Sequence, residues 1–125
     1  MRHWLIALAL GSAYLIAYLP ALSAGYVYED RYFVDVPFDR PTPELSLNPR
    51  SLPDVTFGLQ AGASPRAHHA VNMVLHALVA ALVGIWLVLC GQSTSAAWIG
   101  VTLVLLHPMS VESTAYVASR PELLA

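Results

Sequence analysis

The sequence predicts an all-α integral membrane protein, with about three transmembrane helices and a proline-rich external loop after the first. Hydrophobic residues make up 57% of the chain and charged residues only 11%, whereas about a quarter of the residues of a soluble domain are charged. The run from Ala67 to Val111 contains no Asp, Glu, Lys or Arg. As one helix it would be about 67 Å long, roughly twice the hydrocarbon core of a bilayer, so we expect it to cross twice.

The first helix is predicted within residues 1–24, where the apolar run from Trp4 to Leu22 is long enough to span. The small residues at 21–24 also resemble the end of a cleavable signal peptide. The run of about 19 residues exceeds the usual apolar core of such peptides, which favours a retained helix. Under either interpretation the segment that follows is exported.

Residues 25–66 form the predicted external loop. Arg2 favours a cytoplasmic amino terminus, which places this loop on the non-cytoplasmic side of the membrane. The loop holds six of the nine prolines and six of the eight acidic residues, so we expect no long regular helix in it. A short helix on the membrane surface, starting near Pro53, is compatible with this composition.

The rest of the chain is predicted to form a second transmembrane helix, a cytoplasmic turn, a third helix with its exit segment, and the start of a further element, at residues 67–90, 91–95, 96–118 and 119–125. The third helix is the shortest, because Ala96 to His107 covers only about 18 Å at helical rise. Pro108 then removes a backbone hydrogen bond. We therefore expect a kink in the third helix.

Charge and cysteine content exclude several classes of function. The formal net charge is -2, and the six arginines are scattered along the chain, so nothing indicates a nucleic-acid partner. Cys90 is the single cysteine, which excludes an intramolecular disulfide and a cysteine metal site. We expect no metal and no cofactor.

Two acidic residues, Glu29 and Asp30, directly follow the first helix. Paired acids at a membrane surface can supply a general base or bind a metal, because a neighbouring like charge raises the proton affinity of one of them. Beside Arg31, the same pair is also typical of a solvated patch next to a membrane helix. The pattern alone leaves both interpretations open.

A polar face is predicted on the second helix, where His69, Asn72 and His76 are spaced three and four residues apart. Polar groups inside a membrane need partners, which favours hydrogen bonds between helices. Metal binding by the two histidines would require a third ligand from another element.

A third group of polar residues, His107, Glu112 and Arg120, follows the predicted third helix and emerges on the outer side. An acid, a histidine and an arginine that converge at a lipid boundary can bind a phosphate group and assist proton transfer. Read singly, they also fit a helix end followed by a charged surface turn.

These clusters occur in the order seen in membrane glycosyltransferases of the GT-C type. The resemblance is to the branch with the transmembrane, tetratricopeptide-containing protein O-mannosyltransferases and their bacterial relatives. It rests on four segments: an aromatic and acidic element, an arginine, proline and leucine stretch, the polar helix face, and the end of the third helix, at residues 27–31, 50–57, 69–76 and 107–124. Glu29 stands where the family usually has an aspartate, and Ser51 where it usually has a proline.

The resemblance implies the amino-terminal portion of a GT-C fold. It implies transfer of mannose or a similar sugar from a polyprenyl-phosphate donor to a protein or other acceptor on the non-cytoplasmic side, without a metal. Asp30, with Glu29, takes the catalytic role by position. Substrate binding then falls to four residues, His107, Glu112, Arg120 and Arg50. Partners are membrane lipid, the donor and an acceptor protein, in a bacterial inner membrane or, in a eukaryote, the endoplasmic reticulum membrane.

Enzymes of this type have many more membrane crossings than three. We therefore expect the 125-residue chain to be a fragment that is inactive alone, and sugar transfer by the purified chain would contradict this. One alternative function is a small membrane scaffold or partner subunit that docks through His69, Asn72 and His76. Another is a piece of a transporter or channel in which the intramembrane histidines line a path.

Overall fold

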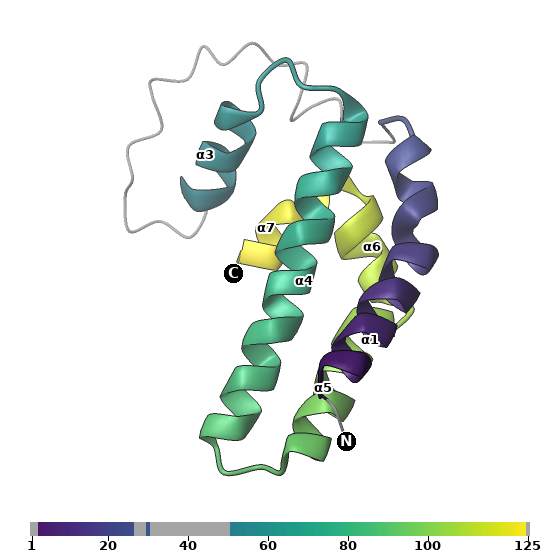
Figure 1. The fold of residues 1–125 in the computed structure, drawn as a ribbon. Coiled ribbons are helices and arrows are strands. Elements are labelled where there is room, and N and C mark those ends of the chain that lie inside the picture. The colour runs from purple at the N-terminus through teal and green to yellow at the C-terminus, as the bar shows by residue number, and fades with distance from the viewer. Residues whose placement is uncertain (1–2, 27–29, 31–50, 125) are drawn as a thin grey trace.

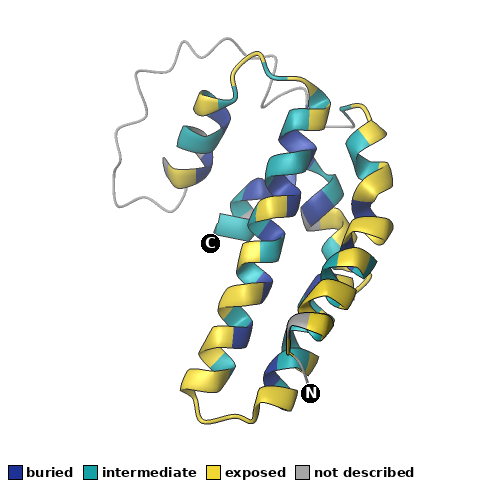
Figure 2. Ribbon diagram, viewed as in Figure 1, coloured by how far each residue is buried: buried dark blue, intermediate teal, exposed yellow. Residues whose placement is uncertain are grey.

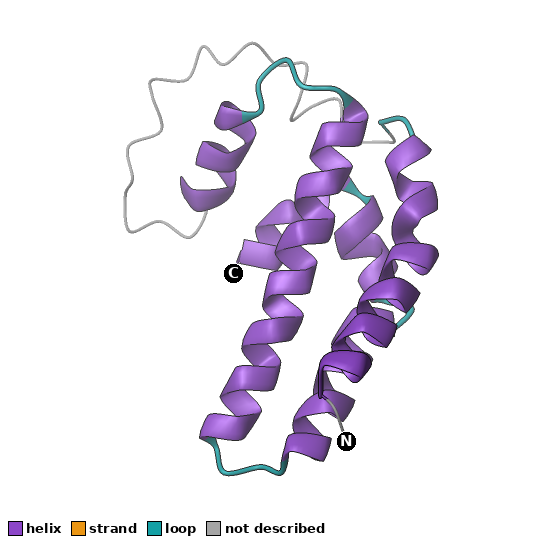
Figure 3. Ribbon diagram, viewed as in Figure 1, coloured by secondary structure: helices purple, strands orange, loops and turns teal. Residues whose placement is uncertain are grey.

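A computed structural model describes residues 3–26, 30 and 51–124, and this part of the chain forms helices and no strands (Figures 1 and 3). The all-α prediction is confirmed for these residues, while insertion into a membrane stays a prediction. Glu29 and Arg50 lie outside the described residues. The elements are α1 (His3–Tyr18), the 3₁₀ helix η1 (Leu19–Ser23), α3 (Ser51–Leu59), α4 (Pro65–Leu89), α5 (Thr94–Leu106), α6 (Ser110–Ala115), the 3₁₀ helix η2 (Val117–Ser119) and α7 (Arg120–Leu124).

Two of the described helices are long and apolar enough to cross a membrane, by length and composition: Leu5–Ser23 and α4. α5 is apolar but has only 13 residues, or about 20 Å, which is shorter than the ~30 Å hydrocarbon core. After α5 the chain does not continue as a bent helix. It leaves the helical path at His107, where the backbone is extended, and begins α6 at Ser110.

α4 and α5 form an antiparallel hairpin, and the turn between them is closed by its own backbone. The amide of Gly91 donates to the Val88 carbonyl at 2.9 Å, and that of Gln92 donates to the Leu87 carbonyl at 3.0 Å. This is the Schellman arrangement, which requires a positive φ at the first residue after the cap, and Gly91 has a φ of 79°. The Ser93 hydroxyl then accepts from the Ala96 amide and caps the start of α5.

The end of η1 and the start of α4 lie at the opposite end of the molecule, and the short helices lie beside the adjoining half of α4 (Figure 1). Pro65 occupies the first turn of α4, and the Ser64 hydroxyl accepts from the Ala67 amide as its cap. The Tyr26 hydroxyl donates to the Ala63 carbonyl at 3.1 Å, which ties the chain after α1 to the entrance of α4. The amino terminus and the α4–α5 turn lie at the other end (Figure 1).

The core is narrow and lies between α1, α4 and α5. Tyr14 and Tyr18 of α1 pack with Met73 and Ala80 of α4 and with Leu105 of α5. Figure 2 shows many exposed positions along the outer sides of these helices. Large apolar residues occupy many of them, among them Leu8, Ile16, Leu78, Leu82, Leu89, Ile99 and Leu103. An apolar exterior of this kind is unfavourable in water and favourable in lipid.

We expect Gly84→Ala to destabilise the α4–α5 hairpin by about 1–3 kcal/mol. A Cβ at Gly84 would lie 2.6 Å from Cγ2 of Val101, and a helical valine has essentially one allowed rotamer with which to yield. The measurement is equilibrium unfolding in detergent micelles. Gly11→Ala is the matched control, because a Cβ there meets nothing within 4 Å; an equal loss in both variants would contradict the packing argument.

Candidate functional site

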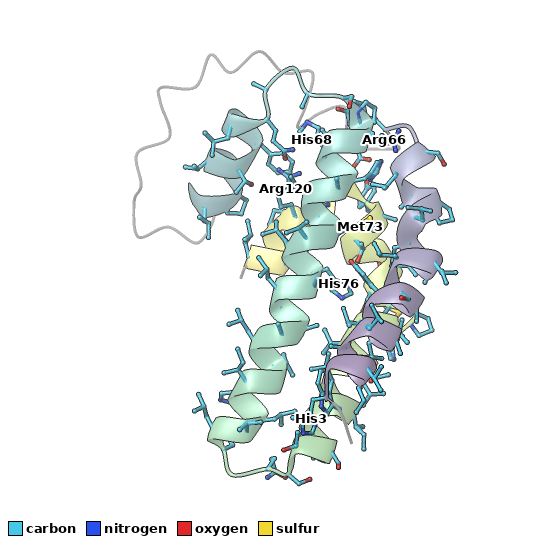
Figure 4. All side chains as sticks on the ribbon, viewed as in Figure 1. His3, Arg66, His68, Met73, His76 and Arg120 are labelled. Carbon is cyan, nitrogen blue, oxygen red and sulfur yellow. The ribbon has the colours of Figure 1, made fainter. Side chains whose placement is uncertain are left out.

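The most connected side chain of the described residues is Arg120, the first residue of α7, which is completely buried. Its Nε donates to Oδ1 of Asn72 at 2.8 Å, and its Nη2 lies 3.3 Å from both the carbonyl oxygen and Nδ1 of His68. Its Nη1 donates to the Thr56 hydroxyl at 3.4 Å, and the guanidinium stacks 4.3 Å over the Phe57 ring. Arg120 therefore joins α3, α4 and α7 (Figure 4).

Burial of the Arg120 side chain shifts the pKa of its guanidinium group. Removal from water lowers the pKa of Arg120 to about 10, because the charged form loses hydration. The guanidinium is still protonated at neutral pH. Its Nη2–H group can donate to Nδ1 of His68 only if that nitrogen is unprotonated, so a neutral His68 carries its proton on Nε2.

Asp30 meets the segment just before Arg120. The Asp30 side chain is completely buried, and its Oδ1 accepts a hydrogen bond from the Ala118 amide at 2.8 Å. Two residues earlier, the Tyr116 carbonyl accepts from Nδ2 of Asn72 at 3.1 Å. Asn72 thus holds Tyr116 with its amide nitrogen and Arg120 with its amide oxygen, and this fixes the backbone that binds Asp30.

His76 occupies a second buried network, one helical turn further along α4. Pro108 has no N–H, so the carbonyl four residues earlier, that of Val104, loses its helical partner. Nε2 of His76 lies 3.0 Å from this oxygen, and the Ser110 hydroxyl donates to it at 2.9 Å. Because a carbonyl only accepts, Nε2 carries the proton of a neutral His76.

The other nitrogen of His76, Nδ1, is then an acceptor. The Thr114 hydroxyl lies 3.1 Å from it and the Tyr14 hydroxyl 3.3 Å. Tyr14 also donates to the Met73 carbonyl at 3.0 Å. The Thr114 hydroxyl also lies 2.7 Å from the Ser110 carbonyl. Each hydroxyl has one proton and a backbone carbonyl within reach, so the one that donates to Nδ1 of a neutral His76 cannot donate to its carbonyl at the same time. The network connects α1, α4, α5 and α6.

His69 lies on the same face of α4 as Asn72 and His76, but its surroundings differ from theirs. It is fully buried, and neither of its ring nitrogens has a hydrogen-bond partner in the structure. Nε2 of His68 and Oε1 of Gln60 are likewise buried without a partner. Among the described residues, no group of three His, Cys, Asp or Glu side chains is placed to hold a metal ion.

The structure separates the residues that the sequence grouped with Arg120. His107 and Glu112 are exposed, whereas Arg120 is enclosed. Nδ1 of His107 accepts from the Met109 amide at 3.2 Å and so closes the turn after α5. Within the described residues no hydrogen bond or ion pair joins either of them to Arg120.

Several residues of these networks had no predicted role. Tyr14 belongs to a segment predicted only as an apolar helix. Thr56, Phe57 and Thr114 fall within the family-like segments 50–57 and 107–124, but the sequence assigned them no contact or function. The position of the freed carbonyl was readable, because Pro108 always frees the oxygen four residues earlier in a helix. The sequence did not show which side chain would donate to this oxygen, because helical periodicity does not say which other helix a face packs against.

Comparisons of this chain with protein-family models, with curated proteins and with solved structures found no match. The resemblance to GT-C glycosyltransferases therefore rests on the residues quoted above.

We expect Arg120→Met to destabilise the fold by about 2–4 kcal/mol, because the variant leaves the Asn72 oxygen and the Thr56 hydroxyl without their partner. Unfolding in detergent micelles measures the loss. Arg66→Met, at an exposed position of α4, is the matched control and should change stability by less than about 0.5 kcal/mol. Equal effects of the two variants would rule out the proposed structural role of Arg120.

The Val104 carbonyl provides a second test, by a double-mutant cycle. Ser110→Ala and His76→Phe each remove one donor, and we expect losses of about 0.5–1 and 1–3 kcal/mol. The double variant leaves the carbonyl with neither donor, so its loss should exceed the sum of the two. Strict additivity in unfolding measurements would show that the two donors do not share this acceptor.

Proposed function

We propose that this chain is part of a membrane glycosyltransferase of the GT-C type. In this proposal the enzyme transfers mannose or a similar sugar from a polyprenyl-phosphate donor to a protein or other acceptor on the non-cytoplasmic side. Asp30 removes the proton of the acceptor hydroxyl, the hydroxyl oxygen attacks the anomeric carbon, and the polyprenyl phosphate leaves.

One observation carries the proposal. Asp30 and Ala118 are 88 residues apart in sequence, and each belongs to a segment that resembles the family. In the structure the Ala118 amide binds the Asp30 carboxylate, and Asn72 of the polar helix face binds both Tyr116 and Arg120. Residues from three of the family-like segments are thus linked by hydrogen bonds, either to the Asp30 carboxylate itself or to the segment that binds it.

The geometry also refines the roles within this proposal. Arg120 is fully buried and already donates to Asn72, His68 and Thr56, so it supports the proposal by orienting the segment at Ala118 rather than by holding a phosphate. Asp30 is fully buried. An acceptor therefore reaches it only after a conformational change that exposes the carboxylate. Glu29 and Arg50 keep their proposed catalytic and substrate-binding roles from the resemblance alone.

The alternative function, a membrane scaffold or partner subunit, would need a docking surface other than the expected one at His69, Asn72 and His76. Asn72 and His76 of the polar helix face bind Tyr116, Arg120, Val104 and Thr114 of the same chain. A partner could not use these side chains without breaking those contacts. The specific observation that favoured a scaffold is therefore accounted for by internal packing.

Asp30→Asn should abolish transfer while the protein remains folded and in the membrane. The assay uses membranes from cells that express the complete gene, a radiolabelled polyprenyl-phosphate mannose and extraction of labelled acceptor. The change replaces a base by an amide of the same shape, so we expect at least a 100-fold loss of rate. Gln92→Glu, at an exposed position of the α4–α5 turn, is the control. Retained transfer by Asp30→Asn would exclude Asp30 as the base, and a loss of folded protein would instead assign it a structural role.

A further inference from the structure

His69 is a buried polar residue whose side chain makes no hydrogen bond. It lies in the second turn of α4, fully buried, and both Nδ1 and Nε2 lack a partner in the structure. Gln60 and His68 also have one unpartnered atom each, but each makes a hydrogen bond with its other end. Asn72 and His76, on the same face of α4, use both of their polar ends. His69 is therefore the exception on this face.

The buried position of His69 has a free-energy cost. Water hydrogen bonds to both ring nitrogens when the side chain is exposed, and burial removes those bonds without replacing them. An apolar side chain of similar size would avoid this cost, so packing alone does not explain a histidine here. A conformation in which water reaches His69 would not carry the cost. The histidine thus favours any such conformation over the one described.

His69 lies close to the contacts that hold the Asp30 carboxylate. It is three residues before Asn72, about 4.5 Å along the axis of α4 and on the same face. Asn72 binds the Tyr116 carbonyl, and two residues later the Ala118 amide binds Asp30. α4 also contacts η2, which contains Ala118. The segment that binds Asp30 is thus held one helical turn from His69.

We propose that His69 is a positioning residue that favours the open form of the Asp30 site, in which the carboxylate is exposed. In the structure Asp30 is enclosed, and the inference rests on the proposed function, which requires a conformational change that exposes it. The same change gives water access to His69, and both ring nitrogens regain hydrogen bonds. Because the ring has none in the closed form, this difference in hydration shifts the equilibrium toward the open form.

Hydrogen exchange at the Ala118 amide measures this opening without any need for sugar transfer. The amide donates to Oδ1 of Asp30, so its hydrogen exchanges with solvent only after that bond has broken. The experiment follows exchange by NMR, with the full isotope-labelled chain in detergent micelles. His69→Leu replaces the imidazole by an apolar group of similar size and removes the cost of the closed form. We expect exchange at Ala118 to become about tenfold slower.

Two further variants separate the polarity of His69 from other effects of the substitution. His69→Gln keeps a polar group at this position and should leave exchange at Ala118 within about threefold of the unaltered chain. His76→Leu makes the same change of residue type where both ring nitrogens have partners. It should make exchange faster, because the Val104 carbonyl loses a donor. Circular dichroism checks that each variant is folded.

Unchanged or faster exchange at Ala118 in His69→Leu would overturn the proposal, and so would equal slowing in His69→Gln. Slowing that is confined to the most protected amides of α4 would also overturn it, because His69 would then become exposed only on complete unfolding.

Sugar transfer provides a second readout, in membranes from cells that express the complete gene. His69→Leu should raise the KM for the acceptor about tenfold and leave kcat within about twofold, because fewer molecules are open to the acceptor. An unchanged KM beside slower exchange would overturn the role of His69 in the reaction. A complete protein that transfers no sugar would contradict the proposed function and leave the exchange result unchanged.

Discussion

The structure depends on one constraint: the chain that returns along α4 is not a continuous helix, so side chains must complete its backbone hydrogen bonds. Pro108 ends α5 and frees the Val104 carbonyl, and His76 supplies the missing donor. One turn away, Asn72 donates to the Tyr116 carbonyl after α6 has ended. An unsatisfied backbone group costs several kcal/mol away from water, so the polar residues of α4 are a requirement of the broken return path.

Arg120 has a similar role for the short helices α3 and α7, because its side chain supplies tertiary contacts to both. α3 and α7 have nine and five residues, and helices this short are marginal without tertiary contacts. The guanidinium provides them by stacking on Phe57 and binding Asn72. A buried positive charge becomes tolerable because its donors face oxygen and nitrogen acceptors and an aromatic ring. Asp30 is held by the segment that this arrangement fixes.

The sequence was sufficient for the apolar helices and for the break at Pro108, because hydropathy and the missing amide are local properties. Periodicity also placed His69, Asn72 and His76 on one face of α4. It could not show that two of them bind the returning chain while His69 remains without a partner, since pairing depends on how helices pack. Arg120 was expected at a substrate because an arginine that converges with a histidine and an acid can bind a phosphate group, and no local signal placed Thr56 and Phe57 around it.

The closed turn at Gly91 has a consequence for the order in which the molecule is assembled. All its hydrogen bonds join residues within five positions of each other, so the α4–α5 hairpin can form as soon as both helices have been synthesised. Arg120 instead closes contacts over 48 to 64 residues. Folding therefore passes through a stage in which the hairpin is closed and Asn72 still lacks its arginine, and the chain is most open to proteolysis at that stage.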